Sequence, residues 1–370
     1  MSPTAADWLE RIRELALPSR VKVLNVCGGH ERAISMSGLL TALPATVELI
    51  PGPGCPVCVC PEEDVYEAIQ LALRERVTLL AFGDMLRVPV NVPRSEPRSL
   101  EQAKAAGADI RPIASPTEAV RIAESCRGPV VFFAAGFETT IAPVAAMLAE
   151  GVPDNLFVLL SGRLTWPAVA MLLESGDAGF DALIAPGHVA TVMGPEEWEF
   201  VPNRHRMPAA IAGFRPDTLL AALHSVLSQY LAGRAVLQNC YPEVVRPGGN
   251  LRARRLLTQV MEIADANWRG IGVIPKSGFV LAEAYSAHDA RRALPTYRND
   301  VRKRMGEMPP GCDCARVVLG KLYPDQCRLY GVACTPRKPI GPCMVSDEGA
   351  CRIWWASGKR RNERAAADTV

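Results

Sequence analysis

The chain has 370 residues, of which 49% are hydrophobic and 22% charged, as in a globular protein with two or three packed units. The formal net charge is only +2, and lysine and arginine are scattered, so a nucleic-acid-binding surface is not expected. The longest apolar runs are shorter than the roughly 18 to 20 residues that cross a bilayer, so no membrane segment is predicted. The first twenty residues are charged and lack the apolar stretch of an export signal, which favours a cytoplasmic location.

Short apolar runs alternate with longer amphipathic segments from residue 21 to about 214, a pattern typical of β-α units that make parallel sheets. The expected strands are 21–26, 46–50, 77–83, 109–113, 129–136, 156–160, 181–187 and 209–214. They fit one doubly wound sheet or two smaller sheets side by side, and we favour two related sheets. The Pro- and Arg-rich stretch at 91–99 is interpreted as a loop inserted within the first of these sheets.

One helix, from 115 to 126, carries a plain start signal. Ser115 can cap it, Pro116 suits the first helical position, and Glu118 can complete a capping box. Further along, helices are expected at 217–232 and 250–265, followed by a glycine-punctuated strand region at 268–285.

Three domains are therefore predicted. An α/β domain would span 16–120, a second α/β domain 121–235, and a loop-rich part 236–370, which is richest in cysteine from about residue 309. An N-terminal helix at 5–16 could pack on the third part. The loop-rich part is expected to be held together by whatever its cysteines bind.

Twelve cysteines are unusual in a chain expected in a reducing cytoplasm, where such clusters more often bind metals or carry redox chemistry than form structural disulfides. Cys27, Cys126 and Cys240 stand apart, whereas three cysteines lie within 55–60 and six within 312–351. Two cysteine-rich sites are predicted.

In open α/β sheets, ligands bind beyond the carboxyl ends of the strands. Cys27 follows the first expected strand, GPGCPVC the second, Gly83 and Asp84 the third, GFETT (136–140) the fifth, and His188 the seventh. We expect these residues to meet in one cleft. Within GFETT, Glu138 and Thr139 could instead cap the next helix, and packing within the loop is an equal alternative for His188.

The stretch CGGH joins Cys27 to two glycines and His30. A free cysteine here could be a small buried hydrophobe. Against that interpretation, Gly28 and Gly29 allow backbone conformations and close approaches that a core strand does not need. His30 is close enough to support a ligand of the thiol, and we expect it to orient that ligand by hydrogen bonding rather than to bind metal itself.

Cys55 and Cys58 form a C-x-x-C pair, with Cys60 two residues further. Thiols at this spacing can close into a reducible disulfide, and a helix expected to begin near Pro61 would lower a nearby thiol pKa. Half of a zinc site and simple loop packing stay open, although no second C-x-x-C or H-x-x-x-H partner is obvious. Redox use is favoured.

The C-terminal cysteines give the strongest metal signal. Cys314, Cys327, Cys334 and Cys351 are separated by 12, 6 and 16 residues, and Cys312 and Cys343 are further candidates. Four thiolates from a loop-rich segment match the needs of a [4Fe-4S] cluster, and zinc is the main competitor.

Taken together, these motifs resemble the HypD family of [NiFe]-hydrogenase maturation factors, from about residue 21 to 355. The resemblance is carried by CGGH (27–30), GPGCPVC (52–58), FGDMLRVP (82–89), GFETT (136–140), APGHV (185–189), WRGIGVI (268–274) and MVSDEGAC (344–351). It implies two Rossmann-like parallel-sheet domains side by side and a third domain with a [4Fe-4S] cluster. Relatives often have a second histidine where this chain has Arg32.

The resemblance also implies a function: a scaffold that builds the Fe(CN)2CO unit together with a small partner, HypC, and takes cyanide from a second partner, HypE. It implies that Cys27 binds the nascent iron, that His30 supports it, and that Cys55 and Cys58 are the redox pair. The cluster ligands would be Cys314, Cys327, Cys334 and Cys351, with Cys312 or Cys343 as possible substitutes. Gly28 and Gly29 would let backbone N–H groups reach the diatomic ligands, while Asp84, Thr139 and His188 would line the site and Glu138 would take part in its chemistry.

Cyanide leaves a thiocyanate as an anion only when two electrons are added. A dithiol supplies two electrons at once and a cluster supplies them singly, so an external electron donor is expected. The protein is then a maturation scaffold with redox chemistry rather than a conventional turnover enzyme. The alternatives are an iron-sulfur-linked thiol-disulfide oxidoreductase acting on another protein and a zinc-stabilised binding module.

Overall fold

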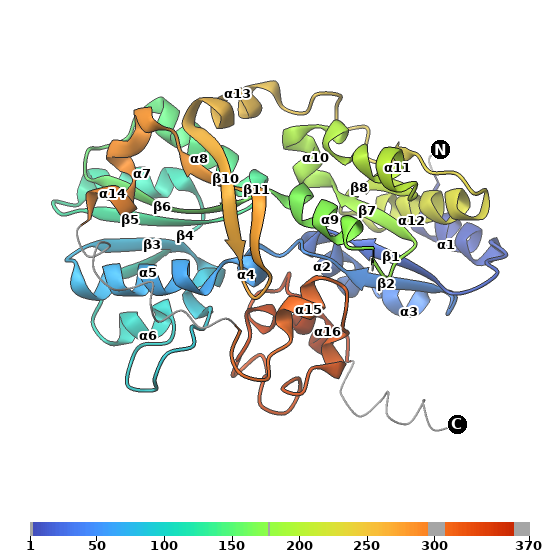
Figure 1. Cartoon of the computed structure of the whole chain (residues 1–370), viewed down its shortest axis with the longest axis horizontal. Coiled ribbons are helices and arrows are strands. Elements are labelled where there is room, and N and C mark those ends of the chain that lie inside the picture. Colours follow the sequence, from blue (N-terminus) through green and yellow to red (C-terminus); the bar gives the residue numbers. More distant parts are fainter. Residues whose placement is uncertain (1–2, 177, 295–307, 359–370) are drawn as a thin grey trace.

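The computed structural model describes residues 3–176, 178–294 and 308–358. Its strands form two sheets that lie side by side, with the C-terminal segment 308–358 below their junction (Figure 1). We call the five-stranded sheet A and the six-stranded sheet B. Within the described ranges, no helix is long and apolar enough to cross a membrane.

Sheet A is parallel throughout, in the order β2-β1-β7-β8-β9. Its strands are β1 (Val21–Asn25), β2 (Val47–Pro51), β7 (Ala182–Pro186), β8 (Ala209–Ala212) and β9 (Leu237–Asn239). The central strands are apolar on both faces because helices cover both sides. One face packs on α1 (Ala5–Glu14), α2 (Gly28–Met36), α3 (Leu39–Ala42) and α12 (Pro216–Leu231), and the other on α9 (Thr165–Glu174), α10 (Gly187–Met193), η2 (Pro195–Trp198) and α11 (Phe200–His205).

Sheet B has the order β10-β11-β6-β5-β3-β4. Its parallel part consists of β3 (Thr78–Phe82), β4 (Ile110–Ile113), β5 (Val130–Gly136) and β6 (Leu156–Arg163). An antiparallel hairpin, β10 (Met261–Trp268) and β11 (Gly272–Leu281), extends the sheet beyond β6. The helices around it are α5 (Glu62–Arg74) and α6 (Leu100–Ala105) on one face, and α7 (Pro116–Ser125), α8 (Glu138–Glu150) and α13 (Leu251–Val260) on the other.

The two sheets alternate along the chain, and this corrects the expected domain ranges 16–120 and 121–235. Sheet A uses 21–51 and 182–239, whereas sheet B uses 78–163 and 261–281. The strand region expected at 268–285, in the third part, contributes β11 to sheet B. The physical link is α9, which follows β6 of sheet B but buries Val169 and Leu173 in the core of sheet A.

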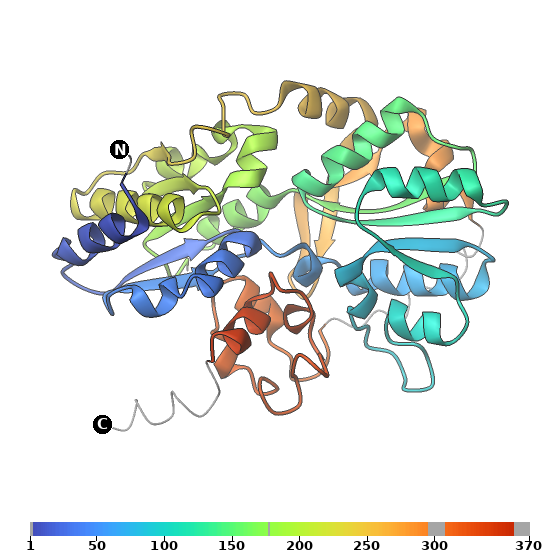
Figure 2. The same cartoon turned by 180° about the vertical axis from the view of Figure 1, so that it is seen from behind.

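All eight expected strands are present in the structure, with ends that differ by one to three residues. Two helix predictions need correction. The N-terminal helix α1 packs on α12, not on the C-terminal part (Figure 2). The helix expected at 250–265 ends at Val260, because residues from Met261 onward pair with β11 instead.

Helix α7 begins where predicted, but the side chain of Ser115 does not cap it as predicted. The helix begins at Pro116, yet the Ser115 hydroxyl contacts Thr117 rather than the helix backbone. The Glu118 carboxylate accepts a hydrogen bond from the backbone N–H of Ala114, at 3.1 Å, instead of from Ser115.

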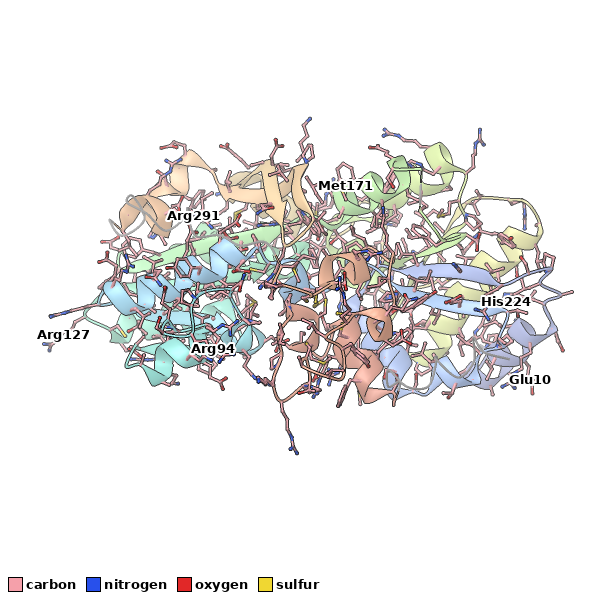
Figure 3. The ribbon with its side chains drawn as sticks, turned by 60° about the horizontal axis from the view of Figure 1, so that its bottom comes forward. Glu10, Arg94, Arg127, Met171, His224 and Arg291 are labelled. Carbon is pink, nitrogen blue, oxygen red and sulfur yellow. A yellow bond between two sulfur atoms is a disulfide. The ribbon has the colours of Figure 1, made fainter. Side chains whose placement is uncertain are left out.

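The C-terminal segment contains no strand of either sheet among its described residues. Its elements are short: α15 (Cys314–Val318), η6 (Pro324–Gln326), η7 (Pro342–Met344) and α16 (Ala350–Ala356). Sulfur atoms gather in this segment, as Figure 3 shows in yellow. Its buried cysteines share one core with α5 and one face of sheet B, so the segment is packed on the rest of the molecule.

Four shorter elements complete the described chain. They are α4 (Pro56–Val59), between β2 and α5, η1 (Gly83–Arg87), directly after β3, and η3 (Glu283–His288) and α14 (Ala290–Ala293), which follow the hairpin. Residues 88–99, between η1 and α6, contain no helix or strand, as expected for the loop at 91–99. Of the expected third part 236–370, residues 295–307 and 359–370 lie outside the described residues.

Candidate functional site

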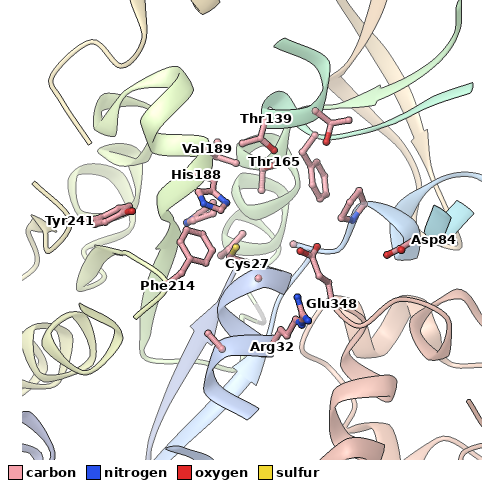
Figure 4. A pocket seen from close by; sticks show the side chains of 18 of the residues that line it. Cys27, Arg32, Asp84, Thr139, Thr165, His188, Val189, Phe214, Tyr241 and Glu348 are labelled. Atoms are coloured by element: carbon pink, nitrogen blue, oxygen red, sulfur yellow. The ribbon is translucent and has the colours of Figure 1, made fainter. Parts of the chain in front are cut away.

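A cavity of about 770 Å³ opens where the two sheets meet the C-terminal segment (Figure 4). Its walls come from the carboxyl ends of strands in both sheets, where parallel strands place their following loops on one edge. The structure brings five of the expected residues to this cavity: Cys27, Gly29, Asp84, Thr139 and His188. Gly28, His30, Glu138, Cys55 and Cys58 lie outside its lining.

Cys27 lies two residues after the end of β1 and is the N-cap of α2. The thiol is half-buried and faces the cavity. Burial raises the pKa of Cys27 to about 12, and the carboxylates of Glu348 and Glu31 add to this, while backbone N–H groups of His30 and Gly29 oppose it. The thiol is therefore protonated at neutral pH, and a cation would have to displace its proton.

His30 is fully buried behind Cys27 rather than in the cavity. Nδ1 lies 3.0 Å from Oδ1 of Asn25, and Nε2 lies 3.1 Å from the carbonyl oxygen of Ala212. Burial lowers the pKa of His30 to about 3, so the ring is neutral. The neutral ring has a single N–H and both facing atoms are acceptors, so His30 donates to only one of them, at the end of β1 or of β8, and orients Cys27 indirectly.

At the two glycines of CGGH, residues from other parts of the chain occupy the space that a side chain would need. A Cβ at Gly28 would lie 2.7 Å from Cβ of Glu348, and one at Gly29 would lie 2.9 Å from Cε1 of Phe214. Gly28 is buried under the C-terminal segment, whereas Gly29 lines the cavity. The missing side chains therefore make room for protein groups.

Phe214, which was not among the predicted site residues, joins the two histidines. Its ring stacks on His188 with centroids 3.7 Å apart and contacts His30 at 4.7 Å. His188 is exposed to the cavity, and partial burial lowers its pKa. The only sequence signal for Phe214 was its place at the carboxyl end of the strand expected at 209–214.

Glu348 and Arg32 form the opposite wall, facing Cys27 (Figure 4). Burial, and then the carboxylate of Asp84, raise the pKa of Glu348, whereas the Arg32 guanidinium lowers it. Asp84 in turn accepts a hydrogen bond of 2.8 Å from the Ser346 hydroxyl. The C-terminal segment thus reaches the cavity beside Cys27, which the sequence did not indicate.

Glu138 lies completely buried beneath the cavity. Its carboxylate accepts hydrogen bonds from the backbone N–H and the hydroxyl of Thr165, at 2.6 and 2.7 Å. It therefore caps α9, the helix that links the two sheets, although Glu138 is itself the first residue of α8. Burial raises the pKa of Glu138 to about 7 despite these donors.

Cys55 and Cys58 form a disulfide with Cα atoms 5.3 Å apart, across the short helix α4 (Pro56–Val59). The pair lies immediately beside Cys27, because the backbone N–H of Gly28 donates to the Gly54 carbonyl at 3.2 Å. On its other side, α4 contacts η7 and α15, which carry Cys343 and Cys314. The disulfide therefore lies between Cys27 and the C-terminal cysteines.

Cys60, at the end of α4, does not have the lowered pKa expected near a helix start. Burial, followed by the carboxylate of Asp64, raises the pKa of Cys60 to about 12. Its sulfur lies 3.4 Å from the Ser161 hydroxyl. Helix α5 does begin at Glu62, but its first-turn carboxylates cancel its positive end.

The C-terminal thiols converge around Cys314, which hydrogen-bonds with Cys312, Cys343 and Cys351. Hydrogen bonds from Cys314 and Cys343 lower the pKa of Cys351, whereas hydrogen bonds to Cys314 raise the pKa values of Cys312 and Cys343. These shifts mean that the thiols share protons, since adjacent thiolates repel one another unless cations separate them. Cys327 lies farther out, with its sulfur 3.8 Å from the Gly311 carbonyl.

Several features suit iron-sulfur ligation. Backbone N–H groups of Ile340 and Cys343 point at the sulfurs of Cys334 and Cys314, both at 3.3 Å, as in clusters tuned by N–H donors. Gly341 leaves space beside the sulfurs of Cys312 and Cys314 that a Cβ would fill. Among the described residues, no three His, Cys, Asp or Glu side chains are placed to hold one metal ion. A four-iron cluster instead binds each thiolate through a different iron, so the donor set fits such a group.

The sequence matches the model of the HypD family, described as "Hydrogenase formation hypA family", over residues 3–358. The chain belongs to the HypD family. Its relatives include hydrogenase maturation factor HypD2 of Bradyrhizobium diazoefficiens, 39% identical over 97% of this chain and 96% of the relative. HypD of Azotobacter vinelandii is 39% identical over 97% and 95%, and HypD of Escherichia coli 38% over 93% and 91%. Membership in HypD over nearly the whole chain makes it a hydrogenase maturation factor.

Proposed function

We propose that this HypD family member is the scaffold on which the Fe(CN)2CO unit is built together with HypC, with cyanide delivered by HypE. The observation that carries the proposal is the order of sulfur groups in space: an accessible thiol, a disulfide directly behind it, and a buried group of thiols behind the disulfide. Low-spin iron with cyanide and carbon monoxide is electron-rich and prefers soft thiolate ligands. Cys27 is the thiol that reaches the cavity.

Cyanide release from a thiocyanate is a two-electron reduction: R–S–CN plus two electrons gives R–S⁻ and CN⁻. In the reduced state, Cys55 and Cys58 supply two electrons and two protons while they form the disulfide that the structure contains. A [4Fe-4S] cluster on Cys314, Cys327, Cys334 and Cys351, with Cys312 or Cys343 as possible substitutes, would supply electrons singly to restore the dithiol. The contacts of α4 with η7 and α15, and the hydrogen bond between Gly28 and Gly54 beside Cys27, support this sequence of steps.

The cavity residues orient the cargo. His188 and Thr139 offer polar atoms, while Glu348 and Arg32 place opposite charges on the wall facing the thiol. The nitrogen ends of cyanide ligands accept hydrogen bonds, and Arg32 and the imidazole of His188 can donate them. His30 and Glu138 act from outside the cavity, as positioning residues for Cys27 and Thr165.

The rival thiol-disulfide oxidoreductase would need a sulfur that a foreign disulfide can reach. Cys55 and Cys58 are only 4% and 3% exposed, so both functions require α4 to move before a foreign disulfide or a thiocyanate can reach the pair.

The experiment is an infrared spectrum of the anaerobically purified complex with HypC. Wild type should show CO and CN stretches, and Cys27→Ser should show none while it keeps the brown colour of a cluster. The Cys55→Ala/Cys58→Ala variant should also lose the bands, and Cys126→Ala, a half-buried thiol remote from the cavity, should keep them. Normal bands in the double variant would discard the redox role, and a colourless protein containing zinc would support the binding-module alternative.

A further inference from the structure

A second, smaller cavity of about 260 Å³ lies outside the assembly site, where residues 335–340 meet the loop 88–99 and helix α6. Four cationic side chains line it: Arg87, Arg98, Arg337 and Lys338, which we call the basic rim. Glu101 is the only acidic residue in the lining. The basic rim is assigned no role by the proposed assembly chemistry.

The basic rim lies directly over one of the sulfurs. Residues 335–340 form its cover, since the backbone N–H of Ile340 donates to Sγ of Cys334 at 3.3 Å, two residues after Lys338. The Arg87 guanidinium fastens this cover to η1 through a 3.0 Å hydrogen bond to the Pro336 carbonyl. Only one short loop therefore separates solvent from Cys334 at this place.

The charge of the rim is not neutralised. Over the described residues, none of its four cations has a carboxylate within ion-pair distance, whereas Arg316 and Arg352 on the same C-terminal segment pair with Asp313 and Asp347. Lys338 and Arg337 are exposed. A group of cations without ion-pair partners around a cavity produces a positive field that attracts anionic partners.

We propose that the basic rim docks an acidic one-electron carrier protein of the ferredoxin type, which reduces the cluster held beneath it. This inference rests on the cluster of the proposed function. Each docking passes one electron from the reduced carrier to the oxidised cluster. Two dockings supply the two electrons that, with two protons, convert the Cys55–Cys58 disulfide into two thiols.

The shape and charge of the rim favour this occupant over others. Electron-transfer partners form small, short-lived interfaces in which opposite charges raise the rate of encounter. The cavity is small, and the exposed side chain of Val332, at 69%, lies two residues before Cys334 on the adjoining turn. A nucleic acid would need a longer basic surface, and the net charge of +2 does not provide one.

The test uses a reduced, acidic plant-type [2Fe-2S] ferredoxin as the probe and the full-length, cluster-containing protein. The variant is Arg337→Glu/Lys338→Glu, and Arg337→Gln/Lys338→Gln removes the charge without reversing it. The control is Arg252→Glu/Arg255→Glu on α13, which changes the net charge equally on the far side of sheet B (Figure 1). Two quantities are measured: binding of oxidised ferredoxin and the rate of cluster bleaching by reduced ferredoxin.

We expect reversal at the rim to weaken binding and to slow bleaching by about tenfold or more at low salt, with a smaller effect of neutralisation. The difference should vanish at roughly 1 M salt, where charges are screened within about 3 Å. The α13 control should behave as wild type. Dithionite, which needs no docking, should bleach every variant equally.

The outcomes separate the two proposals. If the reversed variant binds and accepts electrons from ferredoxin as fast as wild type, docking at the basic rim is wrong while the cluster stands. If anaerobic wild type carries no iron and dithionite changes nothing, the cluster proposal fails and takes this one with it. If dithionite reduction also slows in the reversed variant, the substitution has damaged the cluster, and the binding measurement decides: unchanged binding overturns the docking proposal.

Discussion

The sheets and the C-terminal segment hold their functional sulfurs in different ways. Cys27 is fixed by backbone: it joins β1 to α2, and β1 is paired with a strand on each side, β2 and β7. The cysteines between 312 and 351 lie in loops and short helices, with none of the strands of either sheet among the described residues there. The comparison teaches that Cys27 can be positioned before any metal arrives, whereas the C-terminal thiols depend on what they bind.

The largest effect is expected when a cysteine proposed as a cluster ligand is replaced. Cys351→Ala should abolish the brown chromophore, and residues 308–358 should then exchange their amide hydrogens roughly 1,000-fold faster, about 4 kcal/mol of local stability, because bound metal is their main support. Amides of β1 and β7 should stay protected, as hydrogen exchange with mass spectrometry can show. Full protection of the segment without iron would mean that its apolar core alone is sufficient.

The next largest effect is expected from a substitution that disturbs the backbone packing around Cys27. Gly54 lies against the carbonyl of Val26 and the Cα of Cys27, so a Cβ there overlaps the backbone. Gly54→Ala should lower the free energy of unfolding by about 3 to 4 kcal/mol and stop loading of iron, while the cluster absorption is kept. Gly83→Ala is the matched control, since a Cβ there meets nothing within 4 Å. Equal denaturation midpoints for the two variants would contradict the argument.

The sequence allowed prediction of the strands and of much of the cavity for one physical reason. Apolar runs fix where strands lie, and parallel strands bring the residues that follow them to one edge, as with Cys27, Asp84 and His188. The choice of partner strand is not encoded locally, so the alternation of sheets A and B was missed. Glu348 and Phe214 reach the cavity through tertiary packing alone, and β10 formed where helical periodicity continued because pairing with β11 was available.

A third prediction concerns α9, the helix that links the two sheets, whose first residue, Thr165, donates hydrogen bonds to Glu138. Its folded pKa of about 7 exceeds the ordinary value of 4.5, so the unfolded chain ionises first as pH rises. The contribution of Glu138 to the free energy of unfolding is then greatest below pH 4.5. It falls by about 3 kcal/mol as pH rises to about 7, at about 1.4 kcal/mol per pH unit.

The difference between wild type and Glu138→Gln in urea unfolding should follow this curve between pH 4.5 and 7. The amide still accepts from Thr165 but carries no charge, so the variant should lose this part of the pH dependence. Glu150→Gln, at the exposed end of the same helix, should leave the curve unchanged. A parallel pH dependence of wild type and Glu138→Gln would show that Glu138 is ionised throughout.

The smallest effect tests how the C-terminal segment is attached to sheet B. The Ser346 hydroxyl is 2% exposed, donates to Asp84 at 2.8 Å and accepts from the backbone N–H of Glu348 at 3.2 Å. Asp84 is exposed and water can replace the lost donor, so Ser346→Ala should cost about 1 kcal/mol. The amide of Glu348 should exchange about fivefold faster, with unchanged cluster absorption. Ser357→Ala, which removes a hydroxyl that donates to the Trp354 carbonyl, should not affect Glu348. If both variants exchange alike, the segment is attached to the sheets through its sulfur-containing core, and the polar contact at the cavity wall is incidental.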